Sequence, residues 1–461
     1  MKDSAKRFLL LPFSGLLPSS ICVLLAAALV FLAALTIPNL GLGFSPPLEL
    51  LLIHPYAPIA QSPGNLSTAA PPSDPGSRSV PNLAQNISVP ARGGGGRGGG
   101  GGGGDSIDRE ARVCDLYTGK WMPDPRGPLY RNDACPILSQ AQNCQGNGRP
   151  DRDYESWRWV PDGCGLARFN ATEFLRIMRG KVLGFVGDSV ARNQMESLMC
   201  ILMQVENPVN KGNKRMQRWF FRSSKVTIVR IWSSWLVKST PGDASVKSAT
   251  RIHIDQPDAN FMDFLPSVDV LVISSGHWFV KKSAFMRGGQ VVGTQGWHRP
   301  NATMTTSKAF AASMTTALTA IAASRNYKGL TVFRTFSPDH YIGGSWNTGG
   351  SCTGITKPLT DNEVKRIGSS VFTSEMRRIQ LEAFAEAKRN ASGGGARLVL
   401  MDVTRVFEYR ADGHPGSFRS KDPSGKVAAQ DCLHWCMPGP VDTWNEFLLH
   451  IIVTHKINTA A

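Results

Sequence analysis

The stretch that decides the fold is KVLGFVGDSVARNQMESLMC, residues Lys181–Cys200. Its first part, Lys181–Val186, is a short apolar run that predicts a buried strand. The part that follows, Val190–Cys200, repeats apolar residues at helical spacing and predicts a helix with one apolar face. Gly187 lets the backbone turn sharply between the two. The stretch therefore predicts a strand, a tight turn and a helix, with Ser189 near the helix start.

Two interpretations of Ser189 follow from this position. The free N–H groups and the dipole at a helix start favour negative charge. A serine there can act as a nucleophile whose own amide helps to hold an oxyanion. Asp188 and Ser189 are equally typical of a helix N-cap without any catalytic role. The tripeptide Gly-Asp-Ser alone leaves both interpretations open.

Length and composition bound the rest of the chain. With 461 residues, 42% of them hydrophobic, it is long enough for one large domain or two to three ordinary ones. The formal net charge of +16 suits nucleic acid, acidic polysaccharide or a membrane surface. Lysine and arginine are scattered, however, and no nucleic-acid-binding motif accompanies them. The composition therefore favours a basic, solvated surface and indicates no nucleic-acid partner.

Cysteine usage indicates an oxidising compartment. Of the nine cysteines, Cys22 lies in an N-terminal apolar run, and the other eight suit four disulfides. The sequence has no Cys-x-x-Cys pair and no tight Cys/His cluster at zinc spacing, so no metal site is expected. Five N-glycosylation sequons point to the same compartment. The disulfide candidates are Cys114, Cys135, Cys144, Cys164, Cys200, Cys352, Cys432 and Cys436, and the glycosylation candidates are Asn65, Asn86, Asn170, Asn301 and Asn390.

The N-terminal segment predicts a membrane anchor. Residues 1–15 are basic, and residues 16–37 are almost wholly apolar, close to the length that crosses a bilayer. No Lys or Arg follows until Arg78, so the charge asymmetry puts residues 1–15 in the cytosol and the head in the lumen. A cleaved signal peptide is the alternative. The length of the run and the lack of a small-x-small site favour an uncleaved signal anchor.

Two further segments precede the main part of the chain. Residues 38–112 show no helical or strand period and include the glycine run 93–104, which predicts a disordered stem. Residues 113–180 are dense in Cys, Trp, Pro and Gly and predict a loop-rich, disulfide-stapled lobe packed on something larger. Together with residues 181–461, this lobe would form the lumenal head.

Beyond Arg179 the pattern is typical of an α/β fold. Short strand-like runs alternate with long helices, which argues for a mainly parallel sheet covered on both faces. Ligands bind such sheets beyond the carboxyl ends of the strands, where Ser189, Ser275–His277, 334–338 and 402–404 would fall. The predicted strands are Val182–Val186, Val268–Ser274, Leu330–Phe336 and Arg397–Val403, and the predicted helices are Val190–Met203, Thr305–Ser324 and Ser374–Arg389.

A second stretch with catalytic potential is QDCLHWCMPGPVDTWNE, Gln430–Glu446. Asp431 and His434 are three residues apart, which would place them on one face of a helical turn. An aspartate there can accept from Nδ1 of the imidazole and leave Nε2 free as a base. The pair would complete a nucleophile, base and acid with Ser189. A surface ion pair is the alternative interpretation.

Together these stretches resemble the plant trichome birefringence-like family of wall polysaccharide O-acetyltransferases, which carries the PC-esterase domain. The resemblance runs from about Cys114 to Glu446 and rests on the Gly-Asp-Ser block at 187–189 and on DCLHWC at 431–436. Supporting motifs are NGRPDRDYESWRW at Asn147–Trp159, Gly276-His277-Trp278, FRTFSPDH at Phe333–His340 and DGHPG at Asp412–Gly416.

The resemblance implies a fold and a set of roles. The family is similar to GDSL/SGNH hydrolases, so we expect a three-layer α/β/α head with the smaller stapled lobe. Ser189 would be the nucleophile, His434 the general base and Asp431 its orienting acid. Many members have Asn-Thr before Gly-His-Trp, whereas this chain has Ser274-Ser275, so the oxyanion donor stays open. The oxyanion and substrate candidates are Gly187, Asp188, Arg192, Asn193, Ser274, Ser275, Gly276 and His277.

Other polar and aromatic residues have competing interpretations. Asp188 is more typical of a capping residue than of a triad member, and His277 suits substrate contact or packing equally. Asp339 and His340 form a weak rival for the base, because adjacent loop residues point apart. His414 is expected in a turn, with substrate contact as the alternative. Tryptophans expected mostly in packing, with one or two as sugar-stacking platforms, are Trp121, Trp157, Trp159, Trp278, Trp346, Trp435 and Trp444.

The cysteines that flank His434 suggest how it is held. A bond between Cys432 and Cys436 would brace only one turn, whereas bonds to distant cysteines would fix the histidine from two sides. We therefore predict one bridge from this pair to Cys144 and one to Cys352. The remaining Cys114, Cys135, Cys164 and Cys200 would pair among themselves.

The resemblance also implies a function. It is the transfer of acetyl groups, through a serine acyl-enzyme, to hydroxyls of a cell-wall polysaccharide, with xylan or another hemicellulose expected. The protein would be a single-pass type II Golgi membrane protein with no bound cofactor and with acetyl-CoA or another acyl donor as co-substrate. Two alternatives stay open: a polysaccharide acetylesterase, and a non-catalytic protein that binds or bridges wall polysaccharides.

Overall fold

The computed structural model describes residues 115–212, 216–368, 370–391, 397–420 and 429–457. All of them belong to one of the two compact units of the chain, Pro55–Ala461. The predicted tail, anchor and stem lie outside the described residues, as do Cys114, Asn65 and Asn86. Among the residues that are described, no helix is both long enough and apolar enough to cross a bilayer.

A seven-stranded sheet forms the centre of this unit, in the order β13-β12-β9-β3-β6-β5-β4. The strands from β13 to β6 run parallel, and β5 and β4 are antiparallel additions at one edge. All four predicted strands are present, three of them shorter than predicted. The strands are β3 (Val182–Gly187), β4 (Val209–Asn210), β5 (Met216–Phe221), β6 (Val226–Trp232), β9 (Val270–Ser274), β12 (Leu330–Arg334) and β13 (Arg397–Met401).

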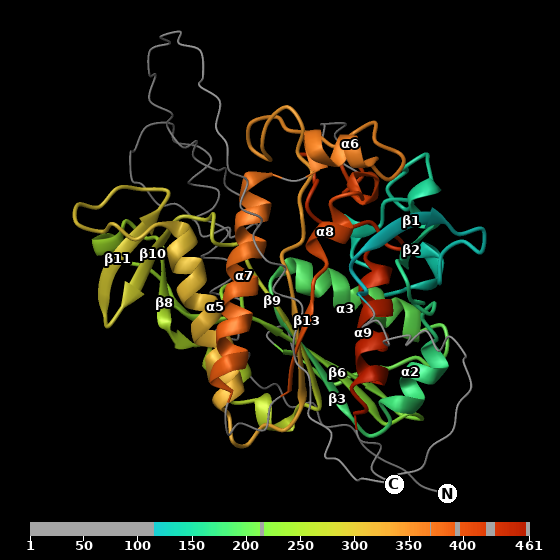
Figure 1. The fold of residues 1–461 in the computed structure, drawn as a ribbon, viewed down its shortest axis with the longest axis horizontal. Coiled ribbons are helices and arrows are strands. Elements are labelled where there is room, and N and C mark those ends of the chain that lie inside the picture. Colours follow the sequence, from blue (N-terminus) through green and yellow to red (C-terminus); the bar gives the residue numbers. More distant parts are fainter. Residues whose placement is uncertain (1–114, 213–215, 369, 392–396, 421–428, 458–461) are drawn as a thin grey trace, which may run out of the picture. The chain divides into compact units, whose positions relative to one another are not determined.

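Helices cover both faces of the sheet, as predicted (Figure 1). Leu183 and Phe185 of β3 join the core shared with α3 and α9, while Val186 joins the core shared with α5 and α7. The result is the expected three-layer α/β/α arrangement. The helices are α2 (Ala171–Ile177), α3 (Ser189–Leu202), α4 (Ala259–Met262), α5 (Thr306–Ala323), α6 (Asp361–Glu363), α7 (Val371–Asn390), α8 (Thr404–Phe407) and α9 (Asp442–Thr454).

The Cys- and Trp-rich N-terminal section packs into the core that contains α3 and α9. Its only two strands among the described residues, β1 (Gly119–Pro123) and β2 (Trp157–Pro161), pair antiparallel. Trp121 of β1 is buried in that core and donates from Nε1 to the Val406 carbonyl at 2.8 Å. The section is loop-rich, as predicted, but it completes the main core rather than building one of its own.

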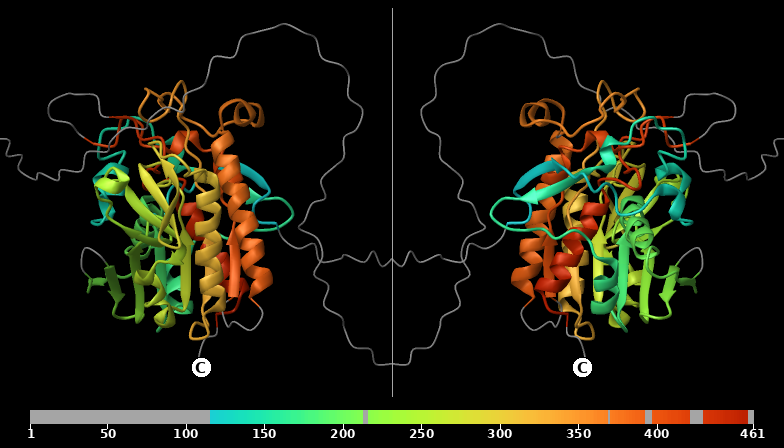
Figure 2. Two further views of the ribbon diagram at one scale, coloured as in Figure 1. Left: turned by 90° about the vertical axis from the view of Figure 1, so that its left-hand side faces the viewer. Right: turned by 90° about the vertical axis from the view of Figure 1, so that its right-hand side faces the viewer.

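A second, four-stranded sheet, which was not predicted, lies beside α5 (Figure 2). Its order is β11-β10-β8-β7. The hydroxyl of Thr316 in α5 donates to the Ile254 carbonyl of this sheet at 2.7 Å. The strands are β7 (Val237–Thr240), β8 (Thr250–Pro257), β10 (Ser283–Arg287) and β11 (Gln290–Gln295).

Candidate active site

The turn between β3 and α3 places Ser189 at the first position of a helix. Gly187 has φ of 152°, and a Cβ there would collide with the carbonyl of Ser274 on the neighbouring strand. Only glycine fits this turn without strain. Asp188 is the N-cap of α3, and its carboxylate accepts from the Val190 N–H at 2.9 Å. The capping interpretation of Asp188 is confirmed, and Ser189 is left half-buried at the carboxyl edge of the sheet.

The structure brings Ser189, His434 and Asp431 together. Nε2 of His434 lies 2.8 Å from Oγ of Ser189, and Nδ1 lies 2.9 Å from Oδ2 of Asp431. With a proton on Nδ1, the imidazole donates to the carboxylate and accepts the serine hydroxyl proton at Nε2. Burial raises the pKa of Asp431, but the charge and hydrogen bond of His434 outweigh it and hold this pKa well below its ordinary value. The carboxylate is therefore ionised when the imidazole needs orientation.

The expectation of a helical turn at Asp431–His434 was wrong. Asp431 forms an isolated bridge with Gly416, and the segment beyond it is irregular. Oδ1 of Asp431 accepts from the backbone N–H groups of Leu433 and His434, at 3.2 and 3.0 Å. A side chain that bonds its own downstream backbone competes with helix formation. The same carboxylate thus shapes the loop and orients the imidazole.

Both predicted disulfides beside the histidine are formed. Cys436 is bonded to Cys144 in the N-terminal section, and Cys432 is bonded to Cys352. Each bridge crosses a long stretch of sequence, 292 and 80 residues, so His434 is held from two distant parts of the chain. Cys135–Cys200 links the N-terminal section to α3, and Cys164 is also disulfide-bonded.

Asn193 braces α3 against the loop that carries His434, residues 431–436. Its Oδ1 accepts from the Trp435 N–H at 2.8 Å, and its Nδ2 donates to the Trp435 carbonyl at 3.3 Å. This two-point contact fixes α3 relative to His434, one residue away. Arg192 lies 3.7 Å from Glu196, with one third of its side chain exposed. Of the two, Asn193 has the positioning role.

The two hydroxyls of the serine pair that stands in place of Asn-Thr both contact buried partners. Oγ of Ser274 accepts from Arg334 at 2.6 Å, and Oγ of Ser275 donates to the Ser234 carbonyl at 2.5 Å. Both hydroxyls are therefore engaged by buried partners. Burial lowers the pKa of Arg334 to about 10. The Ser275 hydroxyl already donates its proton, whereas the Ser274 hydroxyl only accepts, so the candidate donors are the Ser274 hydroxyl and backbone N–H groups, above all that of Ser189, which has no acceptor within its own helix.

His277 forms a second pair with an aspartate, but it faces away from catalysis. Its Nε2 donates to the Ser337 carbonyl at 2.9 Å, its Nδ1 lies 3.4 Å from Oδ2 of Asp188, and its ring stacks on Phe336. Burial raises the pKa of Asp188, but the hydrogen bond and charge of His277 outweigh it, so this pKa lies below its ordinary value. Gly276 admits the Phe336 ring where any Cβ would clash. His277 and Gly276 are thus packing residues.

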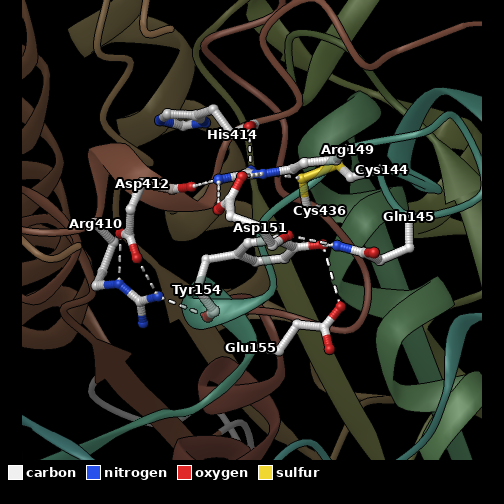
Figure 3. Close-up of polar contacts among 10 residues, drawn as sticks. All are labelled: Cys144, Gln145, Arg149, Asp151, Tyr154, Glu155, Arg410, Asp412, His414 and Cys436. Atoms are coloured by element: carbon white, nitrogen blue, oxygen red, sulfur yellow. Dashed lines mark hydrogen bonds and ion pairs between the residues drawn. A yellow bond between two sulfur atoms is a disulfide. The ribbon is translucent and has the colours of Figure 1, made fainter. Parts of the chain in front are cut away.

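The sequence analysis did not predict a cluster of charged side chains beside the Cys144–Cys436 disulfide (Figure 3). Arg149 is paired with Asp151 at 2.8 Å and donates to the carbonyls of Asp412 and His414 at 2.8 and 3.0 Å. Arg410 is paired with Asp412, and both side chains are fully buried. The NGRPDRDYE and DGHPG motifs are therefore parts of one support that fixes residues 412–414. Their unusual density of charge and glycine was the available signal.

His414 and His340 lie side by side behind the loop that carries His434. His414 lies in a bend, in line with the predicted turn, and is buried, and its Nδ1 lies 2.7 Å from the His434 carbonyl. His340 is not a rival base, because it contacts His414 and the Glu408 carbonyl instead of a serine. Its neighbour Asp339 lies in the same loop, and burial raises the pKa of its carboxyl group.

The tryptophans named in the sequence analysis differ in how far they are buried. Trp121, Trp159, Trp435 and Trp444 are buried in the core, while Trp157 is partly buried against it, and Trp346 is half-buried. Trp278 is half-buried and packs edge-on against Trp232, the cross-strand neighbour of Gly187.

Three of the glycosylation candidates lie among the described residues. Asn170, Asn301 and Asn390 are exposed. The described residues contain no group of three side chains suited to hold a metal ion.

Comparison with known proteins places this geometry in a family. Residues 166–451 match the PC-esterase model, described as a GDSL/SGNH-like acyl-esterase family found in Pmr5 and Cas1p. Residues 112–165 match the PMR5 N-terminal domain. The chain belongs to the PC-esterase family.

Individual relatives support this assignment. The chain is 52% identical to Protein YLS7 of Arabidopsis thaliana over 75% of this chain and 73% of that protein. It is 51% identical to Protein trichome birefringence-like 18 of the same species, over 74% and 66%. It is 39% identical to Xyloglucan O-acetyltransferase 4 of Populus trichocarpa, over 75% and 82%. The small COPII coat GTPase SAR1 of Encephalitozoon cuniculi matches with 6% identity over 62% of this chain and 89% of that chain, and its TM-score of 0.22 carries no argument.

Proposed function

We propose that this protein is a polysaccharide O-acetyltransferase that works through an acetyl-serine intermediate on Ser189. The observation that carries the proposal is the 2.8 Å contact between Oγ of Ser189 and Nε2 of His434, with Asp431 behind the imidazole. Membership of an acyl-esterase family and similarity to a xyloglucan O-acetyltransferase support the choice of acyl group and acceptor.

The first half-reaction forms the acyl-enzyme. His434 takes the proton of Ser189 at Nε2 while Oγ attacks the acetyl carbonyl carbon of the donor. The Ser189 N–H, at the positive end of α3, stabilises the oxyanion. Collapse of the tetrahedral intermediate breaks the bond to the donor's leaving group, which receives the proton from His434. Asp431 stabilises the imidazolium throughout.

The second half-reaction moves the acetyl group to a sugar hydroxyl. His434 takes the hydroxyl proton as the sugar oxygen attacks the acetyl carbon. Collapse of the tetrahedral intermediate then breaks the bond between this carbon and Oγ of Ser189, and Oγ receives the proton from His434. Trp232 and Trp278, half-buried next to the catalytic turn, suit stacking against sugar rings. The acceptor is a wall polysaccharide, with xylan or another hemicellulose as the first choice, and the donor is acetyl-CoA or another acyl donor.

Acetyl-ester hydrolysis is the second candidate, because the family description is that of an acyl-esterase. The same three residues would serve, with water in place of the sugar hydroxyl. Purified protein given an acetyl donor and a panel of deacetylated polysaccharides separates the two. Acetylated polymer supports transfer, and free acetate from acetylated polymer without transfer supports hydrolysis.

The acyl-enzyme gives the direct test of the mechanism. Short incubation with donor alone should place one acetyl group on Ser189, detected by peptide mass spectrometry. Ser189→Ala should abolish labelling and turnover, whereas Ser307→Ala in α5 should change neither. Labelling that persists in a folded Ser189→Ala protein would exclude this mechanism.

The compartment is part of the same proposal. The disulfides at Cys432 and Cys436 suit an oxidising lumen, and residues 16–37 have the composition of a signal anchor. The head would then face the Golgi lumen. Retention in the membrane after carbonate extraction, with glycans on Asn170 or Asn301, is the expected result. A glycan-free protein released by carbonate would contradict it.

A further inference from the structure

A row of three short polar contacts runs from the Glu408 carbonyl to the catalytic histidine. The Glu408 oxygen lies 3.0 Å from Nε2 of His340. Nδ1 of His340 lies 2.7 Å from Nε2 of His414. Nδ1 of His414 lies 2.7 Å from the carbonyl oxygen of His434. Both imidazoles are almost fully buried, with 1% and 3% of their surface exposed.

These three contacts determine how many protons the two imidazole rings must carry. A carbonyl oxygen can only accept, so Nε2 of His340 and Nδ1 of His414 must each carry a hydrogen. A neutral imidazole has only one N–H, so the two nitrogens that face each other would both present lone pairs. Two lone pairs repel at 2.7 Å, whereas one proton between them makes a short hydrogen bond. The contact therefore needs a third proton.

We infer that His340 and His414 share one additional proton, and that this protonated pair holds the His434 carbonyl and so positions the base against Ser189. The inference rests on the proposed function for its consequence, but not for its geometry. Neither imidazole touches the reacting atoms, so both are positioning residues. His414 also stacks on Trp435, next to His434, which restricts its ring to one orientation.

Burial opposes the extra charge, and Asp431 and the neighbouring carbonyl groups offset this effect only in part. Burial lowers the pKa of both imidazoles, that of His340 to about 4 and that of His414 well below its ordinary value. The negative charge of Asp431 and the bond to the His434 carbonyl act in the opposite direction on His414. The other ionisable or charged groups around the pair are Asp339, Tyr341, Glu408, His434 and the ion pairs Arg149–Asp151 and Arg410–Asp412.

The sign of the pH dependence follows from this count. The hold on His434 is complete while the pair carries its third proton, and it is lost as pH rises through the pKa of the shared proton. Above that pH the short contact between the two imidazoles must open, and Nδ1–H of His414 no longer donates to the His434 carbonyl in the same geometry. We expect kcat to fall on this limb while KM stays constant, because the pair does not contact substrate.

Direct detection of the proton tests the inference without catalysis. The sample is the folded full-length protein labelled with ¹⁵N-histidine. Its NMR spectrum should contain a strongly downfield proton resonance that couples to one ring nitrogen of His340 and to one of His414. It should disappear in His340→Gln and in His414→Asn and persist in His298→Asn, an exposed control. Absence of the resonance from active wild-type protein across the whole pH range of activity would overturn the inference.

Kinetics then tests the positioning role. His414→Ala removes the donor to His434 and should lower kcat roughly ten- to a hundredfold, the cost of a misplaced catalytic group. His414→Asn keeps an amide donor where Nδ1 lies, so it should restore most of kcat and remove the alkaline limb that the shared proton causes. If the Asn variant shows the wild-type limb, or is as impaired as the Ala variant, the shared proton has no positioning role. A wild-type protein that shows the shared-proton resonance but has no acyl-transfer activity would instead count against the proposed function.

Discussion

Two aspartate–histidine pairs flank Ser189, and they differ in what their second ring nitrogen contacts. In the pair Asp431–His434 the imidazole binds the carboxylate through Nδ1 and faces the serine hydroxyl through Nε2. In the pair Asp188–His277 the Nδ1 contact is looser, at 3.4 Å, and Nε2 donates to a backbone carbonyl. The first pair has a free accepting nitrogen for the nucleophile, whereas the second uses that nitrogen in the fold.

The backbone around each pair explains the difference. His434 lies in an irregular loop that two disulfides bracket, so its ring can point into the edge of the sheet. His277 lies three residues beyond the end of β9, in a turn, and its ring stacks on Phe336 and bonds the Ser337 carbonyl. The same two residue types therefore present an imidazole to a serine hydroxyl in one place and fix a turn in the other.

The largest expected effect separates the two histidines. His434→Ala should lower kcat by at least about a thousandfold, because triad members supply that much in comparable enzymes. The variant should remain folded by circular dichroism and thermal melting. Turnover of the acetyl donor by the variant within tenfold of wild type would show that His434 is not the base.

Removal of one of the two disulfides beside His434 should have the next largest effect. Cys352→Ser combined with Cys432→Ser should lower activity about ten- to a hundredfold, because the base loses one of its two attachments, and should lower the free energy of unfolding by roughly 2–4 kcal/mol. Activity and far-UV circular dichroism, followed together during titration with a reductant, check the order of events. We expect activity to fall first. Simultaneous loss of both signals would mean that the bridges support the whole sheet.

His277→Ala should affect stability more than catalysis. It leaves the buried carboxylate of Asp188 without its partner, which should cost about 1–3 kcal/mol in urea unfolding. The rate should fall by no more than about tenfold, through a small shift of the cap on α3. A thousandfold loss of kcat in a stable variant would show that the second pair also has a catalytic role, so that the two pairs would not differ in function.

The smallest effect on activity is expected from substitution of buried carboxyl groups that are not paired with a histidine. Burial raises the pKa of Asp442 and of Glu446, each to about 7, whereas that of Asp431 is held low. Because the folded pKa exceeds the unfolded value, stability should fall as pH rises from about 4 to about 7 and then level off. Asp442→Asn should flatten part of this fall, by a few kcal/mol at most, since each pKa unit is worth about 1.4 kcal/mol. Urea unfolding of both proteins at several pH values measures the difference, and parallel curves would contradict it.

The sequence was most informative where local rules and function coincide. The apolar run before Gly187 and the helical spacing after it predicted β3, the turn and α3, and the residues of the first pair followed from a recognisable motif. The disulfide partners of Cys432 and Cys436 could be reasoned from the need to hold His434 at two points. In each case a single physical requirement acts on neighbouring residues or on a short set of candidates.

The rest could not be predicted because it depends on contacts between distant residues. Nothing in Ser274 indicates that Arg334 will occupy its hydroxyl, and nothing in His414 indicates that its neighbour will be His340. The strands of the second sheet, such as β10 and β11, carry mixed polar and apolar residues and depend on pairing for their conformation. Asp431 predicted a helical turn by spacing, but its carboxylate bonds its own backbone and prevents one.

The order of the catalytic residues along the chain has a consequence for biosynthesis. His434 follows Ser189 by 245 residues, which a ribosome needs roughly 10–50 s to add. During that interval the growing polypeptide already contains the serine but lacks the imidazole, the carboxylate and the cysteine partners of Cys144 and Cys352. A nascent or truncated chain therefore carries a serine no more reactive than any on its surface, and acyl chemistry can begin only after the last segment has emerged and been oxidised.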